Sequence, residues 1–204
     1  MKYTALILLC SWLGHTTVQA AENDNVLDEL VFCLVCHGYQ AQGNPSVGAP
    51  ALVGIEDWYL RAALAAYRGG TRAGYAAAMD MQAAARMLPE DDFAKVLRLL
   101  NELPPRELQA AVVVDAALLQ KGRESYAQFC ASCHGADGEG NQILAAPGLR
   151  RLNDWYLQAA WESYLTGGRG NDSADGASQM AQFARALPDS FDIDAVVVFL
   201  TASE

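Results

Sequence analysis

The sequence predicts an all-α protein with two tandem domains, and three observations support that fold class. Cys33 and Cys130 lie 97 positions apart, and so do the two DWYL segments at 57–60 and 154–157. Apolar residues recur with helical spacing in both copies, whereas signals typical of β-strands are nearly absent. Each copy would contain about 90 residues, which is long enough for a domain. The chain is therefore expected to be a tandem duplication of one helical fold.

Each copy is expected to form about three main helices joined by long loops. In one helix of each copy, apolar residues follow an i, i+4, i+7 pattern that gives a single buried stripe. A second stripe lies near the end of each copy, where preceding aspartates favour a helix N-terminus. The stripes consist of Leu60, Leu64 and Tyr67, of Leu157, Trp161 and Tyr164, of Phe93, Val96, Leu99 and Leu100, and of Ile193, Val196, Phe199 and Leu200.

The N-terminus has the layout of a secretory signal peptide. Lys2 is followed by an apolar run over residues 3–13 and then by small and polar residues that end at Ala20. A membrane-spanning helix needs roughly 20 apolar residues, so this run predicts a cleaved peptide rather than an anchor. No later stretch is long enough to span a bilayer. We therefore expect cleavage after Ala20 and a periplasmic protein without stable membrane insertion.

The domain boundaries follow from the duplication and from a proline pair. Pro104 and Pro105 end a helical segment and begin a linker. Loss of the signal peptide removes Lys2 and changes the formal net charge from -10 to -11. Such an acidic chain is a poor ligand for nucleic acid and favours basic partners. The expected organisation is a signal peptide at 1–20, a first domain at 21–103, a linker at 104–115 and a second domain at 116–204.

The motifs CLVCHG at 33–38 and CASCHG at 130–135 contain every cysteine and histidine of the mature chain. Two cysteines three positions apart on a helix project from one face, so both can form thioethers with one haem while the adjacent histidine binds its iron. Zinc could use the same residues, but it would leave each histidine pressed against a cysteine. A thioredoxin-like pair would require a βαβ setting that is missing. Two copies in register therefore predict two c-type haems, held by Cys33, Cys36, Cys130 and Cys133, with His37 and His134 on the irons.

The sixth iron ligand is expected to be methionine, because no histidine remains for a second axial bond. Met180 is the only methionine of the second copy, whereas the first copy contains Met79, Met81 and Met87. The repeat alignment selects Met81, which like Met180 lies eight residues before a Leu-Pro proline. Met87 is interpreted as a core filler, and Met79 stays an alternative to Met81. His/Met ligation raises the reduction potential of a haem.

Further segments recur in both copies. They are Pro50-Ala51-Leu52 and Pro147-Gly148-Leu149, the Gly-rich turns with Arg72 and Arg169, and Met81 and Met180 ahead of a C-terminal helix. With the two motifs, these residues make the chain resemble class I cytochromes c, and over its whole mature length the two-haem cytochrome c-four family. The resemblance implies two domains related by a pseudo-twofold axis with facing haem edges. It also implies that the carbonyls of Pro50 and Pro147 accept the histidine N–H.

Two functions are compatible with this resemblance. The first is a periplasmic carrier that passes single electrons between redox protein partners, for example from a quinol-oxidising complex to a terminal oxidase or reductase. The alternative is the cytochrome subunit of a periplasmic dehydrogenase, either a flavoprotein or a quinoprotein. Catalysis by the chain itself is not expected, because His and Met would fill both axial positions. Transient docking to membrane redox complexes is expected, and Arg72 and Arg169 could either offset haem propionate charge or be solvated.

The two copies differ where the first helix of each is expected to cross the last. The second copy has Gly122 and Tyr126 ahead of its motif, the small and aromatic pair usual at this crossing. The first copy has Asn25 and Glu29 at these places. The helix crossing of the first domain is therefore expected to be weaker, and that domain less stable.

Overall fold

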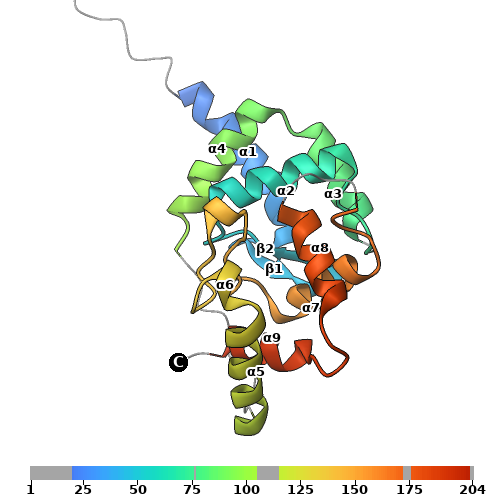
Figure 1. Cartoon of the computed structure of the whole chain (residues 1–204). Coiled ribbons are helices and arrows are strands. Elements are labelled where there is room, and N and C mark those ends of the chain that lie inside the picture. The colour runs from blue at the N-terminus through green and yellow to red at the C-terminus, as the bar shows by residue number, and fades with distance from the viewer. Residues whose placement is uncertain (1–19, 76, 105–114, 172–175, 203–204) are drawn as a thin grey trace, which may run out of the picture.

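Two copies of one helical arrangement follow each other along the chain (Figure 1). The structure, a computed structural model, describes residues 20–75, 77–104, 115–171 and 176–202. Residues 1–19 of the expected signal peptide and 105–114 of the expected linker lie outside the described residues. We refer to residues 20–104 as the N-terminal unit and to residues 115–202 as the C-terminal unit.

The N-terminal unit contains helices α1 to α4 and a small β-hairpin. The α2 helix ends at Gly69, and the next residue, Gly70, takes a left-handed conformation with φ of 76° that suits a residue without a side chain. The first turn of α4 contains three acidic residues, which complement the helix dipole. The elements are α1 Ala20–His37, β1 Gln42–Asn44, a 3-10 turn Pro45–Val47, β2 Ala49–Ala51, α2 Asp57–Gly69, α3 Ala77–Met87 and α4 Glu90–Glu102.

The C-terminal unit contains helices α5 to α9. Aspartate side chains cap its first and last helices: Asp115 accepts from the backbone N–H of Ala117 at 2.8 Å, and Asp192 from that of Ala195 at 3.2 Å. The elements are α5 Ala116–Phe129, α6 Ala131–His134, a 3-10 turn Gln142–Leu144, α7 Asp154–Leu165, α8 Gly176–Ala186 and α9 Ile193–Thr201.

In each unit the first helix crosses the last, so α1 packs on α4 and α5 packs on α9 (Figure 1). The α5–α9 crossing is close, because a Cβ atom placed on Gly122 would lie only 1.9 Å from the carbonyl oxygen of Ala195. One turn further on, Tyr126 is fully buried and packs against the ring of Phe199. The prediction that Gly122 and Tyr126 mark this crossing is confirmed.

Each unit has its own apolar core, and the two cores meet. Ile55 belongs to the N-terminal unit by sequence but is buried in the core of the C-terminal unit. Backbone and side-chain hydrogen bonds reinforce this contact: the N–H of Ala73 donates to Gly168 at 2.7 Å, and the Ser163 hydroxyl donates to the Ala73 carbonyl at 2.8 Å. The units therefore contact each other at Ile55, at α7 and at the segments that follow α2 and α7.

The all-α fold class is confirmed, with two additions to the expected elements. Each unit has a further helix, α3 or α8, in the segment that contains Met81 or Met180. The N-terminal unit also pairs two three-residue strands, and the C-terminal unit has a single bridge, between Asn141 and Ala146, in the equivalent place. Among the described residues, no helix combines the length and the hydropathy needed to cross a membrane.

Candidate haem sites at the two cysteine motifs

Each Cys-x-x-Cys-His motif lies at the end of a helix. The α1 helix ends at His37, and the short α6 helix, which follows α5 after Cys130, ends at His134. The next residue in each case is a glycine with positive φ, 83° at Gly38 and 84° at Gly135, so the chain turns away directly after the histidine. The helical spacing holds both cysteines and the histidine of one motif around the same cavity.

Both motif histidines are buried and hydrogen-bonded to a proline carbonyl. The Nδ1 atom of His37 lies 2.6 Å from the Pro50 oxygen, and that of His134 lies 2.8 Å from the Pro147 oxygen. Burial lowers the pKa of His134. The Pro147 hydrogen bond and the nearby Glu56 charge both raise it, but burial outweighs them. Burial likewise lowers the pKa of His37. Since a carbonyl can only accept, Nδ1 carries the proton and the Nε2 lone pair is available to a metal.

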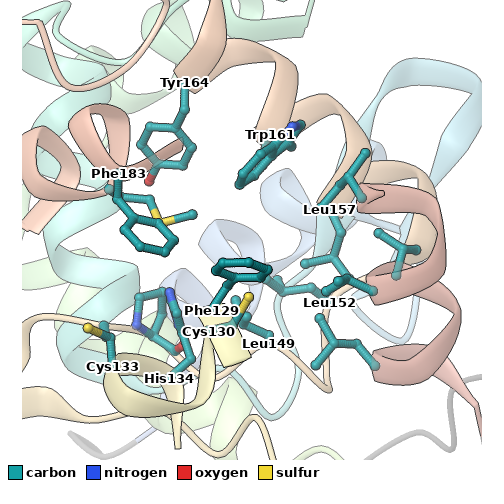
Figure 2. Close-up of a pocket in the computed structure, with 18 of the residues that line it drawn as sticks. Phe129, Cys130, Cys133, His134, Leu149, Leu152, Leu157, Trp161, Tyr164 and Phe183 are labelled. Atoms are coloured by element: carbon teal, nitrogen blue, oxygen red, sulfur yellow. The ribbon is translucent and has the colours of Figure 1, made fainter. Parts of the chain in front are cut away.

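The two motifs line two cavities, of about 350 Å³ in the N-terminal unit and about 320 Å³ in the C-terminal unit. In the C-terminal cavity, Cys133 and His134 lie on one side, and Trp161 and Tyr164 lie on the opposite side (Figure 2). Because each motif lines its own cavity, a zinc site shared by both motifs does not match the structure. A mainly apolar cavity with a few placed polar groups is typical of a cofactor site.

One methionine lines each cavity together with the motif. Met81 from α3 lines the N-terminal cavity, and Met180 from α8 lines the C-terminal cavity. Met79 and Met87 point to solvent, with 77% and 73% of their surface exposed, so the interpretation of Met87 as a core filler is wrong. The structure therefore brings together all the residues proposed from the sequence: Cys33, Cys36, His37 and Met81 in one unit, and Cys130, Cys133, His134 and Met180 in the other.

Between the cavities lies a cluster of two buried arginines and several tyrosines. Arg72 donates to the hydroxyls of Tyr156 and, at 3.2 Å, Tyr59. Arg169 donates to Tyr156 at 3.1 Å and to Tyr75 at 3.4 Å. The arginines come from different units, so this cluster joins the units through side chains.

Both arginines are more than nine-tenths buried, at 6% exposure for Arg72 and 3% for Arg169. Burial alone would raise the pKa of Tyr156, but the two guanidinium charges outweigh it and lower that pKa to about 8. Neither guanidinium forms an ion pair among the described residues, and the Nε atom of each lacks a hydrogen-bond partner there. Buried cations require anionic partners. Each haem carries two propionate carboxylates, so Arg72 and Arg169 fit as partners for haem propionates. Because both arginines are buried, the alternative that they are solvated is wrong.

The tyrosines were missed by sequence reasoning. Tyr59 and Tyr156 are equivalent positions of the duplicated DWYL segment, and both line both cavities. The duplication marked the segment, but it did not indicate that these rings would face the partner unit. Only the docking of the two units brings these rings between the cavities.

The apolar cavities, the neutral histidines and the unpaired buried arginines all fit covalently bound haem. Fold and sites together define the class as c-type cytochromes with two haems. Residues 119–203 match the family model described as Cytochrome c. The chain as a whole has the two-unit helical fold of cytochrome c4. In particular, cytochrome c4 of Acidithiobacillus ferrooxidans superposes with a TM-score of 0.66 over 84% of this chain and 98% of its own, at 24% identity.

Two relatives of known role are similar in sequence. The cbb3-type cytochrome c oxidase subunit FixPc of Rhizobium leguminosarum bv. viciae is 30% identical over 153 residues, which cover 67% of this chain and 50% of that protein. A thiosulfate dehydrogenase electron acceptor of Thiomonas intermedia (strain K12) is 27% identical over 153 residues, which cover 71% and 67%. The chain thus spans about half the length of the cbb3-type oxidase subunits that it matches.

Proposed function

We propose that this protein is a periplasmic electron carrier that passes single electrons between redox protein partners. The observation that carries the proposal is the shared wall of the two cavities, to which Tyr59, Leu152 and Tyr156 all contribute. Two haem sites that meet in this way suit electron exchange within one chain. The proposed thioether residues are Cys33, Cys36, Cys130 and Cys133, and the proposed axial ligands are His37 with Met81 and His134 with Met180.

The chain's own residues hold and insulate the two sites. Each proline carbonyl fixes the orientation of one imidazole, and the buried Arg72 and Arg169 would offset the propionate charge of bound haem between the cavities. The mainly apolar walls disfavour water beside bound haem. When bound, haem supplies a one-electron iron couple. Because a histidine and a methionine would both bind each iron in this proposal, no coordination position would stay open for a substrate.

Two versions of this function correspond to the two kinds of relative. The acceptor of thiosulfate dehydrogenase supports a separate carrier, whereas the oxidase subunits support a role within a larger complex. The carrier is the version we favour, because the cytochrome c4 fold covers 84% of this chain and 98% of the matched structure. The subunit role makes a different prediction, namely that the chain is isolated in a stable complex with a catalytic partner.

The test is stopped-flow electron transfer with the purified dihaem chain. The reduced chain is mixed with a cbb3-type oxidase, and the oxidised chain with a thiosulfate dehydrogenase and thiosulfate. We expect rapid exchange with at least one partner, at a rate that depends on ionic strength because of the net charge of the chain. Slow exchange with both partners, or substrate turnover by the chain alone, would contradict the proposal. Co-purification at fixed stoichiometry with a dehydrogenase or oxidase would favour the subunit version.

A further inference from the structure

Two side chains reach across the interface to equivalent backbone amides in the opposite unit. The Asn153 side-chain oxygen accepts from the N–H of Ala51 at 2.8 Å, and the Glu56 carboxylate accepts from the N–H of Gly148 at 2.9 Å. Glu56 and Asn153 are 97 positions apart, as are Ala51 and Gly148. The two contacts are therefore copies of one arrangement, with a charged acceptor on one side and a neutral amide on the other.

The peptide that each side chain binds is the one whose carbonyl holds a motif histidine. The Pro147–Gly148 peptide donates its N–H to Glu56 and accepts the Nδ1 proton of His134. The Pro50–Ala51 peptide is held in the same way between Asn153 and His37. Hydrogen bonds in such a chain polarise one another, and a bond to a carboxylate is stronger than one to a neutral oxygen.

Glycines make room for both contacts. Gly43 and Gly140 are equivalent residues with φ of 89° and 88°. A Cβ atom on Gly43 would lie 2.6 Å from the Asn153 oxygen, and one on Gly140 would lie 3.0 Å from the Glu56 oxygen. The fold thus provides the same recess in both units, but the acceptors differ: Glu56 is charged, whereas Asn153 is neutral and also donates to the Gln42 carbonyl at 3.2 Å.

We propose that Glu56 is a positioning residue that lowers the reduction potential of the C-terminal haem from across the interface, while Asn153 leaves the N-terminal haem without this effect. The carboxylate strengthens the Pro147 carbonyl as an acceptor, which draws the Nδ1 proton of His134 and makes Nε2 a stronger donor to iron. A stronger donor and a nearby negative charge both favour the ferric state. The proposal rests on the proposed role of His134 as axial ligand. It predicts that one side chain makes the reduction potentials of the two haems differ.

The test compares Glu56→Gln and Asn153→Asp in the full dihaem chain. Glu56→Gln keeps an oxygen acceptor but removes the charge, so the reduction equilibrium constant of the C-terminal haem should rise about tenfold, which is about 59 mV for a one-electron couple. Asn153→Asp should lower that of the N-terminal haem by a similar factor. Redox titration followed by NMR of the methionine methyl groups assigns each potential to its haem.

Glu162→Gln is the matched control, because it removes the same charge from an exposed position of α7 in the C-terminal unit. We expect it to leave the difference between the two potentials within twofold. A Glu56→Gln variant that shifts neither haem, or both haems equally, would overturn the proposal. If Glu56→Gln does not fold, Asn153→Asp is the deciding variant. A selective fall in the reduction potential of the N-terminal haem supports the proposal, and its absence overturns it.

Haem content and the sulfur-to-iron charge-transfer band are measured for every variant. Absence of two covalent haems in the wild type would contradict the proposed function itself, whereas two haems with unshifted potentials would contradict only the role of Glu56. A potential that changes together with loss of the band reports lost methionine ligation, and this outcome also counts against the proposal.

Discussion

The helix crossing of the C-terminal unit depends on a glycine, whereas the N-terminal unit has Asn25 at the equivalent position. Gly122 allows α5 to approach the backbone of α9 at Ala195, and Tyr126 fills the next turn. By contrast, the cysteine motif, the proline carbonyl that holds the histidine, and the methionine at the cavity are present in both units. Duplicated units thus retain the groups that surround the cofactor, while the contacts that hold the helices together diverge.

The helices that contain the methionines also differ in the arginine hydrogen bonds that hold them to the neighbouring helix. In the N-terminal unit, Arg68 of α2 donates to the carbonyls of Ala85, at 2.7 Å, and Leu88 near the end of α3. In the C-terminal unit the arginine comes from the other helix, since Arg185 of α8 donates to the Tyr164 carbonyl at 2.9 Å. Arg68 also pairs with Glu90 at 2.6 Å, and it is the less exposed of the two arginines.

The largest expected effect comes from the methionines. Met180→Ala should abolish the sulfur-to-iron band of the C-terminal haem and lower its potential by a sizeable part of the ~0.8 V range that axial ligands span. No other methionine exists in that unit to replace it. Met81→Ala should do the same in the N-terminal unit. The bands are measured by absorption spectroscopy of the ferric protein.

Met79→Ala and Met87→Ala are the controls, because both side chains are exposed. Both variants should keep the band of the N-terminal haem. Loss of the band in Met79→Ala, with Met81→Ala unchanged, would show that the repeat alignment selects the wrong methionine.

The second effect tests the helix crossing. Gly122→Ala places a methyl group against the Ala195 carbonyl and should lower the free energy of unfolding of the C-terminal unit by about 3 kcal/mol. Gly69→Ala is the matched change in α2, where a Cβ atom meets nothing within 4 Å, and it should be neutral or stabilising by up to about 1 kcal/mol. Urea unfolding measures both. Equal stability of the two variants would mean that the crossing can widen at little cost.

The third effect concerns the arginines that fasten the methionine helices. Arg68→Ala leaves two carbonyls without their donor. It should weaken binding of Met81 to the haem iron by about 2 kcal/mol. Arg185→Ala removes a more exposed contact and should weaken binding of Met180 to the haem iron by about 1 kcal/mol. Titration with imidazole, which competes with methionine for the iron, measures each loss. A larger effect of Arg185→Ala would reverse this comparison.

The smallest effect concerns the hydroxyl of Tyr126, which donates to the Gly135 carbonyl at 2.7 Å. Tyr126→Phe keeps the buried ring and removes this bond, so the C-terminal unit should lose about 1 kcal/mol of unfolding free energy. Tyr39→Phe, at a side chain that is 75% exposed, is the control and should have no measurable effect. Thermal unfolding of the two variants provides the measurement, and an unchanged Tyr126→Phe would show that the Gly135 carbonyl finds another donor.

Local spacing was enough to predict much of the site. The Cys-x-x-Cys-His motifs, the duplication and Met180 can be identified because each depends on positions close in sequence or on a fixed offset. The choice between Met79 and Met81 depended on the alignment. The structure explains why Met81 rather than Met79 lines the cavity. Residues two apart on a helix point to nearly opposite faces, and one face of α3 borders the cavity. The iron ligands themselves stay a prediction.

Within each unit, the all-α class and the two haem motifs can be predicted from the sequence, because helical periodicity and motif spacing are local properties. The close crossing at Gly122 was expected from the resemblance to cytochromes c and is confirmed. What lies between the units depends on the tertiary structure. It buried Arg72 and Arg169 among tyrosines, and it brought Glu56 to the Gly148 amide. No pattern within one unit indicates such contacts, since they depend on how two cores dock and which side chains then lose access to water.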